Sequence, residues 1–310
     1  MKKVTIIILN WNGKEDTLEC LKSVRQLSAI NCQLSTIVVD NGSTDGLVNE
    51  IKNEKLKMKN DNVKLKIIEN KKNLGFAEGN NVGIRYALKE GADYVMLLNN
   101  DTLVEKNMVK ELLWVMEKDK TIAIAGPKIY FAPGFEYHAN RYKEEERGKV
   151  IWYAGGIIDW QNVYASHRGV DEVDHGQYNK EEETDFVTGC AMMVKREVFE
   201  KIGFLDPKYF LYFEDNDFCQ RAKRAGFKIF YVPKAIIYHK NAASSEKPGS
   251  AIQQYYQTRN RFLFGFKYAS LRAKLALLRE NLKFLLKDGI RRKATIDFCL
   301  GRFGGKVGYS

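Results

Sequence analysis

An acidic residue that could hold a metal ion lies at the end of an apolar stretch. Residues 95–98 are all apolar and lead directly into Asn99, Asn100 and Asp101. Such an unbroken apolar run is typical of a strand buried on both faces of a parallel sheet. Open α/β sheets bind ligands at the carboxyl ends of their strands, where Asp101 could hold a divalent cation and, through it, a diphosphate. The same residues also suit a turn and the cap of a helix from about residue 105.

Two earlier stretches, residues 4–9 and 34–39, are mostly apolar, are also expected to form strands, and lead into residues that could contact a nucleotide. Trp11 follows the first stretch, where its ring could either stack on a nucleobase or pack in the core. Asp40 follows the second stretch. An Asp in that place commonly binds a ribose or base in doubly wound folds, although Asp40 could equally belong to a turn.

A glycine-containing segment, residues 73–81, follows a third expected strand at residues 63–69 and opens a helix that ends near residue 90. Gly75 and Gly79 could let backbone N–H groups approach an anion at the N-terminus of this helix. The segment is not a G-x-G-x-x-G motif and does not follow the first strand. Dinucleotide binding of the ordinary dehydrogenase kind is therefore poorly supported.

A second acidic residue, Asp215, is a candidate general base. A helix is expected from about residue 214, and Asp215 shares its inward face with Phe218, Cys219 and Ala222. Bulky aromatic residues that could form the wall of a pocket precede it: Tyr209, Phe210, Tyr212 and Phe213. Alternatively, Asp215 could serve only to stabilise the helix dipole. Asp217 and Arg221 have the spacing of an ion pair, which we expect on the exposed side of the helix.

The strands and helices alternate through residue 130, which predicts an α/β fold with a mostly parallel, twisted, Rossmann-like sheet flanked by helices. The strand ends that carry Trp11, Asp40, segment 73–81 and Asp101 then meet along one edge and together predict a nucleoside-diphosphate site. Residues 131–185 show weak periodicity, and we expect loops and short hairpins that determine specificity. Further strands are expected at residues 184–194, 228–232 and 235–239.

His239 ends the last of these expected strands. A single His is more often a hydrogen-bonded structural residue than a ligand. If this strand end faces Asp101, however, His239 becomes a candidate ligand for the same metal ion.

The composition is that of a globular protein in a reducing, cytoplasmic compartment. Hydrophobic residues make up 45% and charged residues 29% of the 310 residues. The five cysteines are widely spaced without a C-x-x-C pair, which argues against a disulfide framework or a zinc site. We expect neither a signal peptide nor a membrane-spanning segment, because no apolar run is long enough.

The net charge of +11 is concentrated near the C-terminus, where residues 267–293 contain nine Lys or Arg and two acidic residues. Apolar residues at positions 271, 275, 278, 282 and 285 predict an amphipathic helix. This helix could lie on an anionic membrane surface through residues 266–293, pack against the domain, or form a homodimer. Because the excess charge belongs to this tail, we do not expect nucleic-acid binding.

The chain resembles the inverting glycosyltransferases of family 2, which have the GT-A fold. Within that family it is most similar to the rhamnosyltransferase-like enzymes of bacterial surface polysaccharide synthesis. The resemblance covers residues 4–261 and rests on motifs in the family's order, at residues 8–12, 38–45, 73–81, 97–102, 187–189, 213–217 and 256–260. It implies a nucleotide-sugar-binding half at 1–130, an acceptor-binding and catalytic half of the same domain at 131–261, and a basic helical tail at 262–310.

The resemblance also implies roles for individual residues. Trp11 occupies the position that stacks on the base, and Asp40 the position that hydrogen-bonds it. Asp101 matches the last Asp of the DxD motif, which binds Mg²⁺ or Mn²⁺, and His239 matches a later metal ligand. Asp215 matches the general base. The remaining nucleotide-binding positions are Asn10, Asn73, Gly75, Asn80 and Asn100, and the remaining acceptor-side positions are Thr188, Gly189, Glu214 and Arg259.

The sequence departs from the family pattern at two positions. The DxD motif is replaced by Asn-Asn-Asp, which leaves Asp101 as its one carboxylate, and some relatives have Arg at the position of Asn80. The QxxRW motif and membrane helices of processive synthases are not found. We therefore expect the transfer of a single sugar.

The resulting prediction is a metal-assisted glycosyltransferase of cell-surface polysaccharide synthesis. It would move one sugar from dTDP-rhamnose or a UDP-sugar to a hydroxyl of a glycan or lipid-linked acceptor, in the cytoplasm or at the inner face of the membrane. One alternative is a sugar-nucleotide pyrophosphorylase, although its Gly-rich loop after the first strand is replaced here by residues 10–13. The other alternative is a glycan-binding module without activity.

Overall fold

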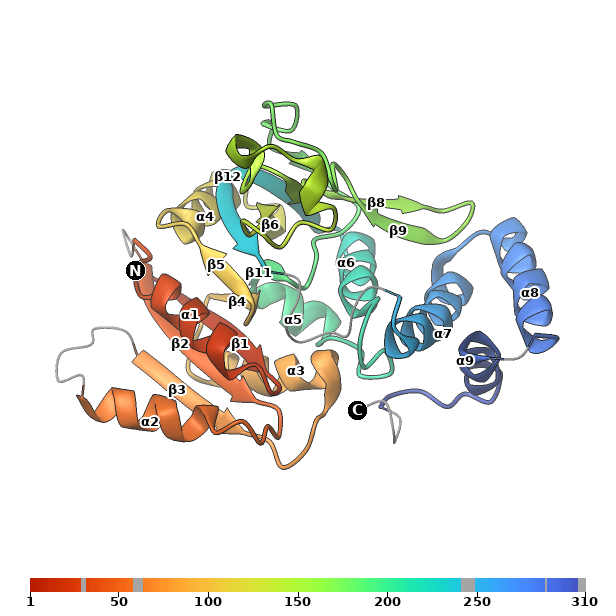
Figure 1. The fold of residues 1–310 in the computed structure, drawn as a ribbon, viewed down its shortest axis with the longest axis horizontal. Coiled ribbons are helices and arrows are strands. Elements are labelled where there is room, and N and C mark those ends of the chain that lie inside the picture. The colour runs from red at the N-terminus through yellow and green to blue at the C-terminus, as the bar shows by residue number, and fades with distance from the viewer. Residues whose placement is uncertain (29–31, 58–63, 241–248, 288, 306–310) are drawn as a thin grey trace.

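The computed structural model describes residues 1–28, 32–57, 64–240, 249–287 and 289–305 (Figure 1). Its centre is a ten-stranded mixed sheet with helices packed on it, which confirms the predicted α/β class. The helices are α1 (Lys14–Val24), α2 (Leu47–Lys57), α3 (Gly75–Lys89), α4 (Met108–Lys118), α5 (Arg196–Ile202), α6 (Glu214–Arg224), α7 (Ala251–Tyr268), α8 (Leu271–Leu285) and α9 (Ile290–Cys299). In Figure 1, α7, α8 and α9 lie together at one end of the molecule.

The N-terminal half of the sheet is parallel, with four strands in the spatial order β3, β2, β1, β4. The inner strands β1, β2 and β4 carry buried, mostly apolar side chains on both faces, and residues 95–98 of β4 are at most 2% exposed, whereas β3 at the edge is partly exposed. Burial on both faces is the reason for the unbroken apolar runs in the sequence. These strands are β1 (Lys2–Asn10), β2 (Cys32–Asp40), β3 (Lys64–Glu69) and β4 (Tyr94–Asn99).

The other half of the sheet is mixed. The antiparallel strand β11 (Ala191–Lys195) pairs with β4 on one side and β6 (Ile122–Phe131) on the other. The long strand β12 (Lys228–His239) then runs parallel to β6. Short strands complete it: β5 (Thr102–Val104), β7 (Ile151–Tyr153) and β10 (Glu182–Glu183). A separate hairpin consists of β8 (Gly156–Asp159) and β9 (Tyr164–His167).

Two expected strand boundaries were wrong. The strand expected at residues 184–194 begins only at Ala191, because a turn in which the Ala191 N–H bonds the Thr188 carbonyl precedes it. The two strands expected at 228–232 and 235–239 are one strand, β12, whose register shifts between Val232 and Ile236. This shift contains Pro233, which has no N–H to donate to a neighbouring strand.

The register of the sheet brings the polar strand ends to one edge. Asn10 at the end of β1 lies opposite Asp40 at the end of β2, and Asn99 at the end of β4 lies opposite Leu9. At the end of β12, His239 pairs with Thr102, the residue after Asp101. The fold therefore places side chains from four strands at a common edge.

Asp217 is the point where α6 is tied to α7, and its position corrects the sequence-based expectation. The predicted pair with Arg221 forms, at 2.8 Å, but the Asp217 side chain is completely buried. Its other carboxylate oxygen accepts hydrogen bonds from Lys267 at 2.6 Å and Tyr268 at 2.7 Å. Burial opposes ionisation of Asp217, but Arg221 and Lys267 outweigh this effect and lower its pKa.

We predict that Asp217→Asn destabilises the protein by about 3 kcal/mol, measured by urea unfolding. This is the low end for a broken buried ion pair, because Lys267 and Arg221 still reach solvent. The matched control is Glu200→Gln, which removes the exposed pair with Arg196 and should cost about 0.5 kcal/mol or less. Equal effects of the two substitutions would contradict the structural role of Asp217.

Candidate active site

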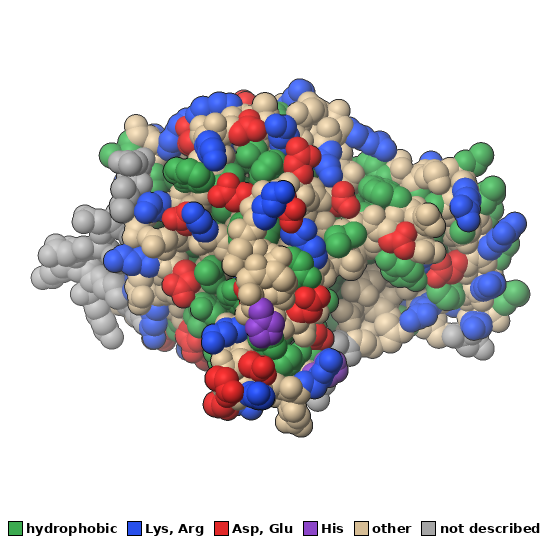
Figure 2. Space-filling model, turned by 90° about the horizontal axis from the view of Figure 1, so that it is seen from above, with side chains coloured by type: hydrophobic (Ala, Val, Ile, Leu, Met, Phe, Trp, Pro, Cys, Tyr) green, Lys and Arg blue, Asp and Glu red, His purple; other side chains and the backbone are tan. Residues whose placement is uncertain are grey.

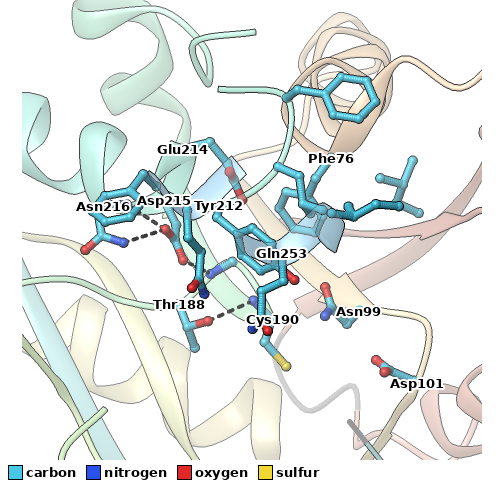
Figure 3. Close-up of a pocket in the computed structure, with 18 of the residues that line it drawn as sticks. Phe76, Asn99, Asp101, Thr188, Cys190, Tyr212, Glu214, Asp215, Asn216 and Gln253 are labelled. Atoms are coloured by element: carbon cyan, nitrogen blue, oxygen red, sulfur yellow. Dashed lines mark hydrogen bonds between the residues drawn. The ribbon is translucent and has the colours of Figure 1, made fainter. Parts of the chain in front are cut away.

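A cavity of about 500 Å³ opens at the carboxyl edge of the sheet. Its lining comes from the ends of β1, β4 and β12, the start of α3, the turn before β11, the segment before α6, and the first half of α7. In the view of Figure 3, Asp215 and Asn216 lie at one side of this cavity and Asp101 at the other, with Tyr212 between them. The candidate residues of the sequence analysis are thus divided between two ends of one site.

The residues predicted to bind the nucleotide divide into two groups. Those that line the cavity are Trp11, Asn73, Gly75 and Asn100. Trp11 keeps 36% of its surface exposed, so its ring is accessible from the cavity rather than packed in the core. The predicted residues that are buried and do not line the cavity are Asn10, Asp40 and Asn80.

Asn10 connects three strand ends beneath the cavity. Its side-chain Nδ2 donates to Asp40 at 3.1 Å. Its side-chain Oδ1 accepts from the Gly13 N–H at 3.0 Å and from the Thr17 hydroxyl at 2.9 Å. The amide of Asn100 donates to Asn10 and to Thr17. In this structure, Asn10 and Asp40 therefore hold the loops after β1 and β2 in place.

The glycines of segment 73–81 have a different role from the one expected. The first amides of α3 already have acceptors: the Gly75 N–H donates to the Asn73 side chain, and the Phe76 N–H to the Phe210 carbonyl. Gly75 has a φ of +81°, and a Cβ there would lie 2.4 Å from the Phe210 ring. Similarly, a Cβ at Gly79 would lie 2.7 Å from Leu9. These glycines permit close packing, and the amides are not directed at an anion.

Asp101 and His239 meet at one end of the cavity. Oδ1 of Asp101 lies 3.1 Å from Nε2 of His239, and both side chains are at least 95% buried. Burial lowers the pKa of His239, but the negative charge of Asp101 outweighs it and raises the pKa well above its ordinary value. Burial alone would raise the pKa of Asp101, but the charge and hydrogen bond of His239 outweigh burial and lower this pKa. The two residues therefore favour opposite charges.

This pair also fits a divalent cation. Nε2 of His239 and Oδ1 of Asp101 face each other at 3.1 Å, which is close enough for both atoms to bind one cation when the imidazole is neutral. Among the described residues, no three His, Cys, Asp or Glu side chains cluster as a metal site. Asp101 and His239 would thus supply two ligands, and small hard cations commonly complete their coordination with substrate phosphates and water.

Asp215 lies at the other end of the cavity, in the first turn of α6. Its Oδ2 accepts a hydrogen bond from the Gly189 N–H at 2.9 Å, and its Oδ1 accepts two from Asn216, at 2.7 and 2.8 Å. Burial raises its pKa, and the hydrogen bonds from Gly189 and Asn216 oppose that rise. The carboxylate is held rigidly beside the cavity and is a stronger base than an exposed Asp.

Glu214, next to Asp215, is 5% exposed and also lines the cavity. Burial, together with the charge of Asp215, raises its pKa well above the ordinary value, which favours the neutral acid. Its Oε2 has no hydrogen-bond partner in the described structure, and the same holds for Oδ1 of Asn216. These are the buried polar atoms that a hydroxylated ligand could satisfy.

The segment that leads into α6 has a strained backbone. Phe210, Tyr212 and Phe213 have φ values of 62°, 67° and 73°, in the left-handed region that side chains disfavour. Asn260 of α7 opposes this strain, since its amide donates to the carbonyls of Tyr209, Leu211 and Tyr212 at 2.7–2.8 Å.

Arg259 holds the same segment, which corrects its expected role on the acceptor side. We call the side chains of Arg259 and Asn260 together the clamp. Its side chain is completely buried, does not line the cavity, and donates to the carbonyls of Lys208, Tyr209 and Gly304. Arg259 therefore positions the segment before Asp215 and does not reach the cavity.

Sequence reasoning missed several lining residues. Trp152 and His167 come from β7 and β9, and Gln253 and Gln257 come from α7. The rings of Trp152 and His239 lie 4.5 Å apart, so this middle region supports the Asp101 end of the cavity. The short strands here have no periodicity long enough to reveal which side chains face inward, and the polar residues of α7 resemble an ordinary solvated face.

The chain belongs to glycosyl transferase family 2, because a sequence model of that family matches residues 5–203. This membership confirms the predicted glycosyltransferase class in preference to a pyrophosphorylase. A model described as the N-terminal domain of galactosyltransferase also matches residues 172–243. These residues include the turn at Gly189 and helix α6, and thus the Asp215 end of the cavity.

Characterised relatives are hexosyl- and rhamnosyltransferases. The low-salt glycan biosynthesis hexosyltransferase Agl10 of Haloferax volcanii is 27% identical over 84% of this chain and 74% of its own length. The dTDP-rhamnosyl transferase RfbF of Shigella flexneri is 25% identical over 83% and 78% of the two chains. The N-acetylglucosaminyl-diphospho-decaprenol L-rhamnosyltransferase of Mycobacterium tuberculosis is 26% identical over 74% of each.

Solved structures confirm the GT-A fold. The structure of TarS 1–349 of S. aureus in complex with UDP-GlcNAc has a TM-score of 0.59, at 16% identity over 96% of this chain and 80% of that one. The mannosyltransferase PcManGT of Pyrobaculum calidifontis, in complex with GDP-Man and Mn²⁺, has a TM-score of 0.54, at 14% identity over 96% and 86% of the two chains. GalNAc-T7 with UDP, GalNAc and Mn²⁺ has a TM-score of 0.60, at 16% identity over 84% of this chain and 51% of that one.

The clamp on the strained segment makes a testable prediction. Asn260→Ala removes the side-chain donor to the carbonyls of Leu211 and Tyr212, whereas the Tyr209 carbonyl keeps Arg259, and should destabilise the protein by about 2–3 kcal/mol in urea unfolding. It should also slow turnover, because Asp215 follows this segment directly. The control is Asn162→Ala in an exposed loop, which should change stability by less than about 0.5 kcal/mol. If the two variants unfold alike, the segment does not depend on Asn260.

Proposed function

We propose that this enzyme transfers one sugar from a nucleoside-diphosphate sugar, either dTDP-rhamnose or a UDP-sugar, to a hydroxyl of a glycan or lipid-linked acceptor, with inversion. The observation that carries the proposal is that the Asp101–His239 pair and the hydrogen-bonded Asp215 line the same cavity. One end suits a charged diphosphate, and the other end suits a hydroxyl that must lose a proton. The rhamnosyltransferases among its relatives support this choice of donor and acceptor.

Donor binding would use the edge formed by β1 and β4. The accessible ring of Trp11 offers a surface for the base, and the side-chain N–H groups of Asn73 offer hydrogen bonds, while Asn100 lines the cavity beside them. Asp101 and His239 would hold Mg²⁺ or Mn²⁺, which when bound supplies positive charge to the departing diphosphate. These assignments give Trp11, Asn73, Asp101 and His239 a role in recognising the donor.

The transfer step would depend on Asp215. Its Oδ2 takes the proton of the acceptor hydroxyl while that hydroxyl oxygen forms a bond to the anomeric carbon of the donor. The bond between this carbon and the diphosphate oxygen breaks, and its electron pair leaves with the diphosphate. Attack from the side opposite the leaving group inverts the anomeric configuration. The N–H of Gly189 and the side chain of Asn216 hold the carboxylate in position.

The acceptor would bind where Thr188, Gly189 and Glu214 line the cavity. Because its raised pKa favours the neutral form, Glu214 can donate a hydrogen bond to a sugar hydroxyl without adding a second negative charge beside Asp215.

All five cysteines are free thiols, which supports a cytoplasmic enzyme. None of the described helices is long and apolar enough to cross a membrane.

A panel of sugar nucleotides would test this proposal. The protein is incubated with dTDP-rhamnose and common UDP-sugars, with and without Mn²⁺, and release of the nucleoside diphosphate is measured. Metal-dependent release from one donor, faster with a glycan or lipid-linked acceptor, is expected. Binding of glycan without release of a nucleotide from any donor would favour a binding module.

The metal site predicts a conditional effect of Asp101→Asn. This substitution should abolish turnover and weaken the binding of nucleoside diphosphate when Mn²⁺ or Mg²⁺ is present, but not in EDTA. Isothermal titration in both conditions measures the difference. The matched control is Asp93→Asn, which lies just before the opposite end of β4 and should leave binding unchanged. Equal loss of affinity in EDTA would contradict a metal role for Asp101.

The base predicts that Asp215→Asn lowers turnover by roughly 10²–10⁴-fold, because Asn cannot accept the proton. The dissociation constant of the donor should stay near that of the wild type, since the donor binds at the other end of the cavity. Glu214→Gln is the control, because it keeps a neutral hydrogen-bond donor and should retain most activity. If Glu214→Gln is the inactive variant instead, the base is misassigned.

The pH dependence follows from the raised pKa of Asp215. Asp215 works in its ionised form, so activity should fall as the pH drops through its pKa in the free enzyme. Because burial raises this pKa, the fall in kcat/KM should occur at a higher pH than for an exposed Asp. A profile of kcat/KM against pH that stays flat down to the ordinary pKa of an Asp would contradict this role.

A further inference from the structure

Helix α8 has two apolar faces, and the body of the protein covers one of them. Ala273 and Leu277 are buried, together with Asn281 on the same side of the helix. The contact is close, since a Cβ at Gly265 of α7 would lie 2.3 Å from Leu277. The face predicted from the sequence, at positions 271, 275, 278, 282 and 285, is therefore not the one that packs against the domain, although Leu285 at its end is partly buried.

The other face carries five leucines that remain exposed. Their exposed fractions are far above those of ordinary core leucines, at 74% for Leu271, 50% for Leu275, 47% for Leu278, 55% for Leu282 and 88% for Leu286. Spacings of three and four residues align them along one side of the helix. Single exposed leucines are common, but a continuous row of them marks an interaction surface. We call these five residues the leucine face.

The charges of α8 are arranged around this face. Arg272, Arg279 and Lys283 are exposed along one flank, and none of them has an ion-pair partner in the described part of the chain. The one acidic residue of α8, Glu280, is turned toward the body, where it accepts two hydrogen bonds of 2.9 Å from Arg261. Figure 2 shows basic and hydrophobic side chains gathered at the end of the molecule where α8 lies.

This charge pattern decides between partners. A two-fold contact with a second copy would place positive flanks against each other, since the same patch faces itself in such an interface. A lipid surface with anionic head groups accepts both features at once, with leucines in the acyl boundary and basic side chains at the phosphates.

We propose that the leucine face docks on an anionic lipid surface. Helix α7 connects this face to the cavity: Gln253 lines the cavity, and Gly265, twelve residues later, contacts α8. At the helical rise per residue, these two points are about 18 Å apart. Docking would therefore bring the cavity near the membrane, where a lipid-linked acceptor lies. This last step rests on the proposed acceptor, whereas the docking itself does not.

The test is co-sedimentation of the full chain with two kinds of vesicle, phosphatidylcholine alone and phosphatidylcholine mixed with phosphatidylglycerol, at low and high salt. We expect stronger binding to the mixed vesicles and weaker binding at high salt. The triple variant Leu275→Ser, Leu278→Ser and Leu282→Ser should bind at least roughly tenfold more weakly. The triple variant Arg272→Glu, Arg279→Glu and Lys283→Glu should lose a similar amount, with the loss concentrated on mixed vesicles.

A matched control uses helix α4, which also exposes an aromatic and basic surface. The variant Lys110→Glu, Trp114→Ser and Lys118→Glu changes side chains of similar kinds on a distant helix, and should bind vesicles like the wild type. Thermal unfolding of each variant shows whether it is folded. Donor hydrolysis without vesicles should be unchanged in all three, which separates a failure of docking from a failure of the proposed transfer.

Three results would overturn the proposal. The first is equal binding to both kinds of vesicle at both salt concentrations, which would remove the role of anionic lipid. The second is a dimer seen by sedimentation velocity that the leucine variant dissociates, without vesicle binding. The third is unchanged vesicle binding in both α8 variants. If vesicle binding behaves as expected but no sugar nucleotide is hydrolysed, docking stands and the proposed transferase activity fails.

Discussion

The geometry of the site depends on residues 210–213, a segment whose backbone conformation is unfavourable for residues with side chains. Phe210, Tyr212 and Phe213 all adopt left-handed conformations, each of which costs of order 1–3 kcal/mol for a residue with a side chain. The side chains of Arg259 and Asn260 offset this cost by donating to the carbonyls of the segment from a buried position. Because α6 begins directly after Phe213, the position of Asp215 is set by this clamp.

The same segment links the two halves of the cavity. The carbonyl of Phe210 accepts the Phe76 N–H at the start of α3, and the Phe210 ring occupies the space that the missing side chain of Gly75 leaves. Helix α3 packs on β1 and β2, which carry the strand ends at the donor side. The rigid sheet edge and the candidate base are therefore joined through one short stretch of chain, and a shift of this stretch would alter the distance between them.

Some of this architecture could be predicted from the sequence. The apolar runs that end near Trp11, Asp40 and Asp101 indicated parallel strands with a common polar edge, because burial on both faces leaves a local pattern. The inward position of Asp215 followed from helical periodicity. His239 was placed near Asp101 only conditionally, since the order of strands in the sheet is not a local property of the sequence.

Other features depend on contacts between distant segments and had no local signal. Periodicity placed Asp217 on an outer side of α6, but α7 covers that side with Lys267 and Tyr268. Gly75 was interpreted as part of an anion site because the ring of Phe210, far along the chain, could not be foreseen. The leucine spacing of α8 correctly predicted an amphipathic helix, but it could not show that a second stripe around Leu277 would pack against the body.

We propose a single displacement at one cavity, in which Asp215 takes the acceptor proton. The most direct test is the anomeric configuration of the product, determined by NMR spectroscopy from the coupling constant of its anomeric proton. The donor would be the sugar nucleotide of known configuration that the enzyme accepts. We expect a product with the opposite anomeric configuration. A product that retains the configuration of the donor would contradict direct attack by the acceptor hydroxyl, and with it the role assigned to Asp215.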